Sequence, residues 1–154
     1  MKARSMLLIA VTCVFGLTLC FADDATLGTW KLNESKSTLG VGMPKNRTVV
    51  YQAVGDKVKV TVDGVDANGK PTHTEWTGKF DGNDYPVVGD PTSDTRAYKK
   101  IDDHTLEMTA KKAGTTTLTG KIVVAPDGKS RTVSVTGTNP AGTKIESTAT
   151  YDKQ

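Results

Sequence analysis

An alternation of apolar and polar residues with a period of two runs through most of the chain after residue 27. Val58, Val60 and Val62, for example, alternate with lysine, threonine and aspartate. Such alternation is typical of strands that bury one face and expose the other. Turn-forming stretches such as residues 66–69 separate these segments, because glycine and asparagine supply the positive φ that tight hairpins need. The pattern predicts consecutive antiparallel hairpins.

We expect eight to ten strands, at residues 28–33, 46–54, 57–64, 72–80, 84–88, 95–101, 104–111, 115–124, 130–138 and 143–152. A meander of this length exposes two edges unless it closes on itself. Gly78, Gly120 and Gly137 lie inside strands, which favours closure because glycine suits bent barrel strands. The predicted fold class is therefore all-β, a single antiparallel up-and-down meander of 8–10 strands closed into a barrel. Residues 34–45 are expected to form a loop with one short helical turn near Ser35.

The first 22 residues have the three-part pattern of a secretory signal. A positively charged start precedes an apolar run from Met6 to Leu19, and small residues precede a cleavage site after Ala22. We therefore expect a secreted or periplasmic protein whose mature domain is residues 23–154. The apolar run is shorter than the ~20 residues that span a bilayer, so no membrane insertion is expected after the signal is removed. Lipid attachment at Cys20 is an alternative that the preceding leucine disfavours.

Removal of this signal changes the cysteine content and the charge of the chain. Cys13 and Cys20 both lie within it, which leaves 132 of the 154 residues without any cysteine. Disulfides and thiolate metal sites are thereby excluded from the mature domain. Loss of Lys2 and Arg4 lowers the formal net charge from +3 to about +1. Carboxylates interleave with the remaining lysines, so we expect no nucleic-acid binding. We also expect a monomer.

Enzyme chemistry finds little support in the residues. His73, Glu75 and His104 could together offer two imidazoles and a carboxylate to a metal. The alternation, however, places His73 and Glu75 on the wet face of a strand, where no dry cavity is expected. The sequence also lacks a nucleophile elbow, a zinc-protease helix motif and a phosphate loop. We therefore expect no enzyme activity, no cofactor and no metal.

The opening of the mature chain carries a family resemblance. Gly28-x-Trp30 resembles the opening motif of the lipocalin and fatty-acid-binding superfamily. Residues 28–33, taken with the ending at residues 151–153, are similar to small exported bacterial lipocalin-like proteins of unassigned activity. The resemblance implies that Trp30 plugs one end of the barrel, with Gly28 beside it. It also implies that a basic side chain from a late strand covers the Trp30 ring as a cation–π contact, and Arg131 is the candidate.

Two departures from the fatty-acid-binding proteins favour the open lipocalin form. Those proteins insert a helical lid after the first strand, and residues 34–45 are too few for one. They also place an arginine two residues before a tyrosine near the carboxyl terminus, where it holds a carboxylate. Ala149 stands two residues before Tyr151 here. The same local pattern does occur at Arg96 and Tyr98, but in a middle strand.

Aromatic and cationic residues within the predicted strands are the candidate ligand contacts. Trp76 and Phe80 share one strand face, and they would serve either as plain core or as a cavity wall; Tyr51 belongs to the same class. Arg96 and Tyr98 also share a face. Facing inward, they could orient a carboxylate or phosphate. Facing outward, they would be a solvated pair beside Lys100, and the charge of that lysine favours the outward orientation.

Large apolar side chains are scarce in the mature chain, and this scarcity bears on function. A barrel of about eight strands is just wide enough to be filled by side chains or to hold one small ligand. Small inward residues favour residual space, and the alternative is a flattened barrel whose sheets collapse together. The function predicted is an exported carrier of a small apolar or amphipathic molecule. Its alternative is a ligand-free structural or protein- or glycan-interaction module of the cell envelope.

Overall fold

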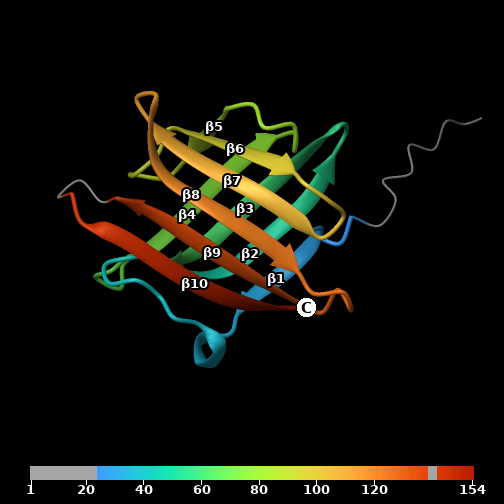
Figure 1. Ribbon diagram of the computed structural model, residues 1–154, viewed down its shortest axis with the longest axis horizontal. Helices are drawn as coiled ribbons and strands as arrows, with labels where there is room; N and C mark the ends of the chain where they lie inside the picture. The colour runs from blue at the N-terminus through green and yellow to red at the C-terminus, as the bar shows by residue number, and fades with distance from the viewer. Residues whose placement is uncertain (1–23, 139–141) are drawn as a thin grey trace, which may run out of the picture.

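A computed structural model describes residues 24–138 and 142–154, which form ten strands and one short 3-10 helix (Figure 1). The elements are β1 (Gly28–Leu32), η1 (Glu34–Lys36), β2 (Lys45–Val54), β3 (Lys57–Val65), β4 (Pro71–Gly78), β5 (Tyr85–Val88), β6 (Thr95–Lys100), β7 (Thr105–Lys112), β8 (Thr115–Val124), β9 (Ser130–Thr138) and β10 (Lys144–Lys153). The predicted all-β class is confirmed, and so is a helical turn at Ser35. The expected signal, residues 1–22, lies outside the described residues.

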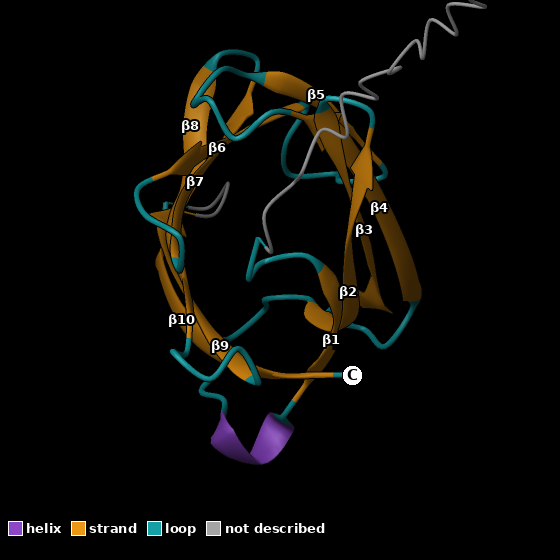
Figure 2. Ribbon diagram, turned by 90° about the vertical axis from the view of Figure 1, so that its right-hand side faces the viewer, coloured by secondary structure: helices purple, strands orange, loops and turns teal. Residues whose placement is uncertain are grey.

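Every strand pairs antiparallel with its neighbours in sequence, and β1 closes the ring against β10. Figure 2 looks into this ring and shows the strands surrounding a common interior. At the closing seam Trp30 lies opposite Lys153 and Leu32 lies opposite Tyr151. The predicted closed up-and-down barrel is therefore confirmed, with ten strands. Closure pairs the two edges that an open meander would expose.

The alternating pattern of the sequence determines which face of each strand turns inward. On β3 the side chains of Val58, Val60 and Val62 are buried, whereas Lys57 is exposed. Gly120 shows why a glycine is needed within a strand, because a Cβ at that position would lie 2.8 Å from Cγ1 of Val135 on β9. Glycine allows the two strands to approach this closely while the barrel curves.

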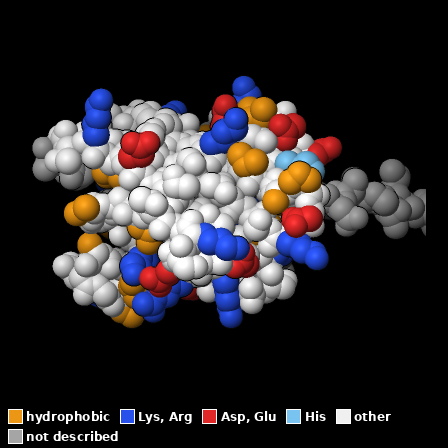
Figure 3. Space-filling model, turned by 60° about the horizontal axis from the view of Figure 1, so that its bottom comes forward, with side chains coloured by type: hydrophobic (Ala, Val, Ile, Leu, Met, Phe, Trp, Pro, Cys, Tyr) orange, Lys and Arg blue, Asp and Glu red, His pale blue; other side chains and the backbone are white. Residues whose placement is uncertain are grey.

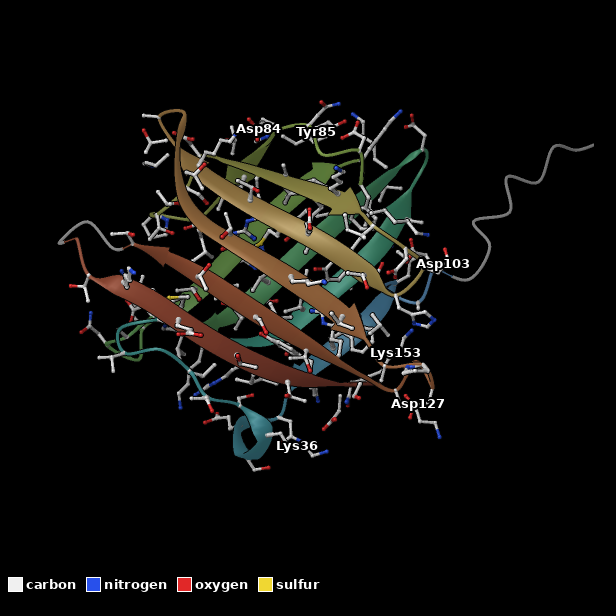
Figure 4. The ribbon with its side chains drawn as sticks, viewed as in Figure 1. Lys36, Asp84, Tyr85, Asp103, Asp127 and Lys153 are labelled. Atoms are coloured by element: carbon white, nitrogen blue, oxygen red, sulfur yellow. The ribbon has the colours of Figure 1, made fainter. Side chains whose placement is uncertain are left out.

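The barrel has two ends that differ in construction. We call one the plug end, which carries residues 24–27 and the turns at residues 55–56, 101–104 and 125–129. Asp103, Asp127 and Lys153 mark this end in Figure 4. We call the other the open end, which carries the turns at residues 66–70, 89–94 and 113–114 and the segment 39–43. The up-and-down topology places alternate turns at opposite ends.

Figure 3 shows a surface on which backbone and side chains that are neither hydrophobic nor charged predominate and charged groups are scattered. Among the described residues no helix has the length and apolar character needed to cross a membrane.

Candidate functional site

A buried tryptophan and a buried arginine close the plug end. The Trp30 ring is 0% exposed, and its Nε1 donates a hydrogen bond to the Thr26 carbonyl oxygen at 2.9 Å. The Arg131 guanidinium carbon lies 4.8 Å from the centroid of the Trp30 ring, 4.8 Å from that of Tyr51 and 5.0 Å from that of Tyr151. The contact of Arg131 with Trp30 is the one that the family resemblance implies. Contacts with two further rings were not predicted.

Lys153 is a second cation at the plug that the sequence analysis missed. Its Nζ lies 5.1 Å from the Trp30 ring centroid and donates a hydrogen bond to the Ala25 carbonyl oxygen. Gly28 lies beside it with φ of 115°, and a Cβ at Gly28 would lie 3.0 Å from the Lys153 side chain. The left-handed φ and the close lysine together favour glycine at this position. Tyr151 and Lys153 are two residues apart on β10, so the alternation that places Tyr151 inward also places Lys153 inward. The position of Lys153 could have been predicted from this alternation.

Four of the predicted ligand contacts meet in one aromatic cluster next to the plug. The Trp76 and Phe80 rings stack with centroids 6.3 Å apart, and Trp76 meets Tyr98 edge-on at 4.7 Å. Tyr51 packs against Tyr98 at 6.4 Å. Tyr85, which was not predicted, completes the cluster at 5.8 Å from Trp76. Since these rings pack against one another and three of the four predicted residues are almost fully buried, the cluster forms the floor of the barrel interior.

Arg96 faces the interior, and the outward orientation favoured by Lys100 is wrong. Arg96 lies opposite Ala110 and Tyr98 lies opposite Met108, both of which are buried. Lys100 shares that face but lies at the plug-end rim of β6, where its Nζ is 3.1 Å from the Asp103 carboxylate. A lysine at the end of a strand can extend into solvent, so its charge says nothing about the orientation of residues near the middle.

A carboxylate from the loop at the open end pairs with Arg96. Nη2 of Arg96 donates to the Asp90 carboxylate at 2.8 Å, and both side chains are less than 15% exposed. The Asp90 carboxylate also accepts hydrogen bonds from Thr92 and Ser93. Burial acts to raise the pKa of Asp90, but the hydrogen bonds from Ser93 and Thr92 and the charge of Arg96 lower it below the usual value. Asp90 is therefore ionised at neutral pH and holds the loop to the barrel interior.

Two arginine side chains in the interior keep polar atoms without a hydrogen-bond partner among the described residues. These atoms are Nε of Arg96 and both Nε and Nη1 of Arg131. Between the arginines lie two phenols, because the Tyr51 hydroxyl interacts with Arg131 and with Tyr98, and Tyr98 interacts with Arg96. Burial raises the pKa of Tyr51 and raises that of Tyr151 to about 12. The hydroxyls of Tyr51 and Tyr151 are therefore neutral at physiological pH.

Toward the open end the inward faces are only half-buried. The half-buried positions on the inward faces of β4, β8, β9 and β10 are Thr72, Thr74, Leu118, Gly120, Val133, Gly137 and Ile145. A hollow of about 440 Å³ lies at the open-end rim of β8, β9 and β10, where inward residues such as Leu118, Gly137 and Ile145 and outward residues both line it; its lining is residues 116–119 and 136–138 with Lys144, Ile145 and Glu146. We call this hollow the cup. Its apolar lining comes from Leu118 and Ile145, which the sequence analysis did not single out.

A second cavity of about 420 Å³ lies beside the cup, between the segment 39–43 and the ends of β2 and β3. Leu39 and Met43 pack against the barrel core, and Lys45 and Arg47 line the rim. The segment 39–43 follows a single bridge between Thr38 and Thr148 on β10. Both hollows open at the same end, and Figure 3 shows that side of the molecule divided into lobes.

The two histidines lie at opposite ends of the barrel, so the considered metal site with Glu75 does not assemble. His73 lies at the open end, with Nδ1 2.6 Å from the Asp63 carboxylate and Nε2 3.6 Å from that of Glu75. The hydrogen bond to Asp63 raises the pKa of His73. His104 lies in the turn at residues 101–104 at the plug end. No cluster of three metal-ligating side chains occurs in the described part of the chain.

No protein-family model matches the sequence, and no curated protein matches it significantly. Among solved structures, EF1p2_mFAP2b bound to DFHBI aligns with a TM-score of 0.47 at 11% identity, covering 84% of this chain and 94% of that chain. The redesigned β-barrel mFAP1 bound to DFHBI aligns with a TM-score of 0.43 at 18% identity over 84% and 95% of the two chains. The redesigned β-barrel b11L5F_LGL gives 0.45 at 14% identity over 88% and 97%. Nothing about a ligand for this chain follows from them.

Proposed function

We propose that this protein is an exported, monomeric, lipocalin-like carrier that binds one small apolar or amphipathic molecule in the cup. The observation that carries the proposal is the half-buried inward lining of the open end around a cavity of about 440 Å³. That volume falls within the range of pockets that hold small ligands, which is about 300–1,000 Å³. The plug end, by contrast, is filled by the buried side chains of Trp30 and Arg131.

The candidate ligand contacts differ in their distance from the open end of the barrel. Leu118 and Ile145 line the cup, whereas Trp76, Tyr98 and Tyr51 pack against one another in the barrel interior and are not part of its lining. Phe80 supports that cluster through its stacking on Trp76. The Nε–H of Arg96, whose guanidinium pairs with Asp90, is a buried donor without a hydrogen-bond partner among the described residues. Apolar walls with a few placed polar groups are typical of such sites.

Two tryptophan substitutions test the site. Ile145→Trp would fill the cup from its lining, whereas Thr132→Trp places the same bulk on the exposed outer face of β9. We expect Ile145→Trp to weaken binding of the neutral fluorescent probe N-phenyl-1-naphthylamine at least tenfold, because about 440 Å³ leaves little room for both. Thr132→Trp should leave probe binding unchanged. Fluorescence titration of the purified protein measures both.

Native mass spectrometry of protein purified from its own host separates the carrier from the alternative. A mass excess that disappears on denaturation would support a carrier and identify its ligand. A bare mass together with no binding of the probe would favour a ligand-free interaction module. Val88, 69% exposed on β5, and Val41, fully exposed in the segment 39–43, would then be the surface to examine.

A further inference from the structure

Two side chains on the lining of the cup carry opposite charges without an ion-pair partner. Lys144 and Glu146 lie on β10, and both are exposed and line the cup. Neither forms an ion pair among the described residues, whereas Lys111 on β7 pairs with Asp84 at 2.7 Å. The sequence before Lys144, residues 139–143, contains no charged residue. The cup therefore presents one ammonium group and one carboxylate that a ligand can bind.

The strand that carries these charges also carries part of the apolar lining. Ile145 lies between Lys144 and Glu146 on β10, and successive residues of a strand point to opposite faces. Ile145 therefore faces the interior while both charges lie on the outer face at the rim, with their Cα atoms about 7 Å apart. Gly137 of β9 lies opposite both Ile145 and Leu118, so no side chain separates these two aliphatic residues. The cup is thus aliphatic on its inner side and charged at its rim.

The two charges act on a singly charged ligand in opposite directions. An anionic head group attracted by Lys144 is repelled by Glu146, and a cationic head group meets the reverse. A head group that carries one charge of each sign can place both beside their opposites. Exposed charge pairs are individually weak, so each favourable contact should raise affinity about threefold and the two together about tenfold.

We infer that the cup selects an amphipathic ligand with a zwitterionic head group, whose charged groups lie at Lys144 and Glu146 and whose apolar chain enters beside Ile145. This inference rests on the proposed carrier function and adds the chemistry of the head group to it. Lys144 and Glu146 are the specificity-determining residues. The aliphatic lining contributes affinity that does not depend on the head group.

Three amphiphiles with the same dodecyl chain test the inference on the unmodified protein. Dodecylphosphocholine is zwitterionic, dodecyl sulfate is anionic and dodecyltrimethylammonium is cationic. Each is titrated against bound N-phenyl-1-naphthylamine, below the concentration at which it forms micelles. We expect dodecylphosphocholine to displace the probe at about a tenth of the concentration that either of the others needs. Free phosphocholine, which lacks the chain, should not displace the probe, and displacement by it would overturn the amphipathic part of the inference.

Charge variants assign the preference to the two residues, because their expected effects have opposite signs. Glu146→Gln should tighten binding of dodecyl sulfate about threefold and weaken that of dodecylphosphocholine about threefold. Lys144→Met should tighten binding of dodecyltrimethylammonium about threefold and again weaken that of dodecylphosphocholine. Glu107→Gln and Lys121→Met are the matched controls, since these exposed residues lie opposite each other on the outer faces of β7 and β8. They should change none of the three affinities.

The outcomes separate the inference from the carrier function. A zwitterion preference that is unchanged in Glu146→Gln and Lys144→Met, or equal displacement by all three amphiphiles, would overturn the inference and leave the carrier intact. Failure of N-phenyl-1-naphthylamine to bind the unmodified protein would overturn the carrier and the inference with it. Because the amphiphile series is measured on unmodified protein, misfolding of one variant does not remove the test.

Discussion

The two ends of the barrel are built from strands with the same alternation, yet one is solid and the other is hollow. At the plug end Trp30, Leu106 and Val124 are each at most 1% exposed. At the open end Leu118 and Ile145 occupy equivalent inward positions and remain half-buried. The difference lies in the volume of the neighbouring side chains, because glycine, threonine, serine and alanine dominate the open half. Alternation determines which way a side chain points, and its volume decides whether the interior closes.

The two ends also differ in the groups that surround a buried arginine. Arg131 at the plug is surrounded by three aromatic rings, whereas Arg96 toward the open end is paired with a carboxylate. Aromatic faces hold a cation without neutralising it, and a carboxylate cancels its charge. The plug therefore keeps an uncancelled positive charge, whereas the charge of Arg96 is cancelled by Asp90. Four measurements would break or sharpen this comparison.

The same truncation at the two ends should give the largest contrast. Leu106→Ala removes a 1% exposed side chain near the plug and should lower the free energy of unfolding by about 2–5 kcal/mol. Leu118→Ala removes a half-buried leucine side chain at the cup. It should lower the free energy of unfolding by less than about half of the loss in Leu106→Ala, because the site is already partly open. Urea unfolding followed by tryptophan fluorescence measures both. Equal losses would contradict a hollow open end.

Asp90→Asn should lower the free energy of unfolding by about 3 kcal/mol, because it leaves Arg96 buried without its counter-charge. Asp84→Asn is the control, since it breaks the more exposed Lys111 pair and should cost under about 1 kcal/mol. The pKa of Asp90 is lowered, so its contribution is complete above the unfolded value of about 3.9 and is lost as the pH falls through the folded value. The free energy of unfolding should therefore fall less steeply with decreasing pH in Asp90→Asn than in the unmodified protein.

Alkaline pH should weaken the plug end. The pKa of Tyr151 is raised to about 12, so the unfolded chain ionises this phenol first, near pH 10. Its contribution is complete below about pH 10 and is lost at about 1.4 kcal/mol for each pH unit up to about 12. Urea midpoints measured between pH 9 and 11.5 would show this fall. Tyr151→Phe should make this fall shallower, with the remaining slope coming from Tyr51, whose pKa is also raised. An unchanged slope would assign the loss to other groups.

The smallest effect is expected from the ion pair on the outer face at the open end. The pKa of His73 is raised by its hydrogen bond to Asp63. Its contribution is therefore complete below the unfolded value of about 6.5 and is lost as the pH rises through the higher folded value. His73→Gln should lower the melting temperature slightly at pH 5.5 and leave it unchanged at pH 8.5. A loss of the same size at both pH values would point to packing instead of charge.

Much of the fold could be predicted because local residue patterns specify strands and hairpins. The segments 115–124 and 130–138 coincide with β8 and β9, and the other predicted strands differ from the observed ones by at most two residues at either end. Phe80 lies beyond the end of β4, although the alternation extends to it. The orientation of Arg96 was the principal error. The alternation shows that Arg96 and Tyr98 share a face of the strand but does not show whether that face turns inward or outward. The pairing with β7, which sets them opposite the buried Ala110 and Met108, shows that it turns inward.

The candidate site was harder to predict than the fold. The shared face of Trp76 and Phe80 was predicted, and the two rings stack, but Tyr98 was expected to face outward and instead packs against Trp76. The mutual packing of these rings depends on the curvature of the barrel. Asp90 was not expected to reach the interior, because loop conformation has no two-residue period.

The sequence by itself determined the all-β class, the order and approximate bounds of the strands, and the face on which each residue lies. These follow from interactions between residues close in the chain, through alternation and turn chemistry. Only the tertiary structure decided which end is filled, that Arg131 lies among three rings, and that Asp90 neutralises Arg96. Those features depend on contacts between strands and loops distant in sequence, whose spacing is set when β1 closes on β10.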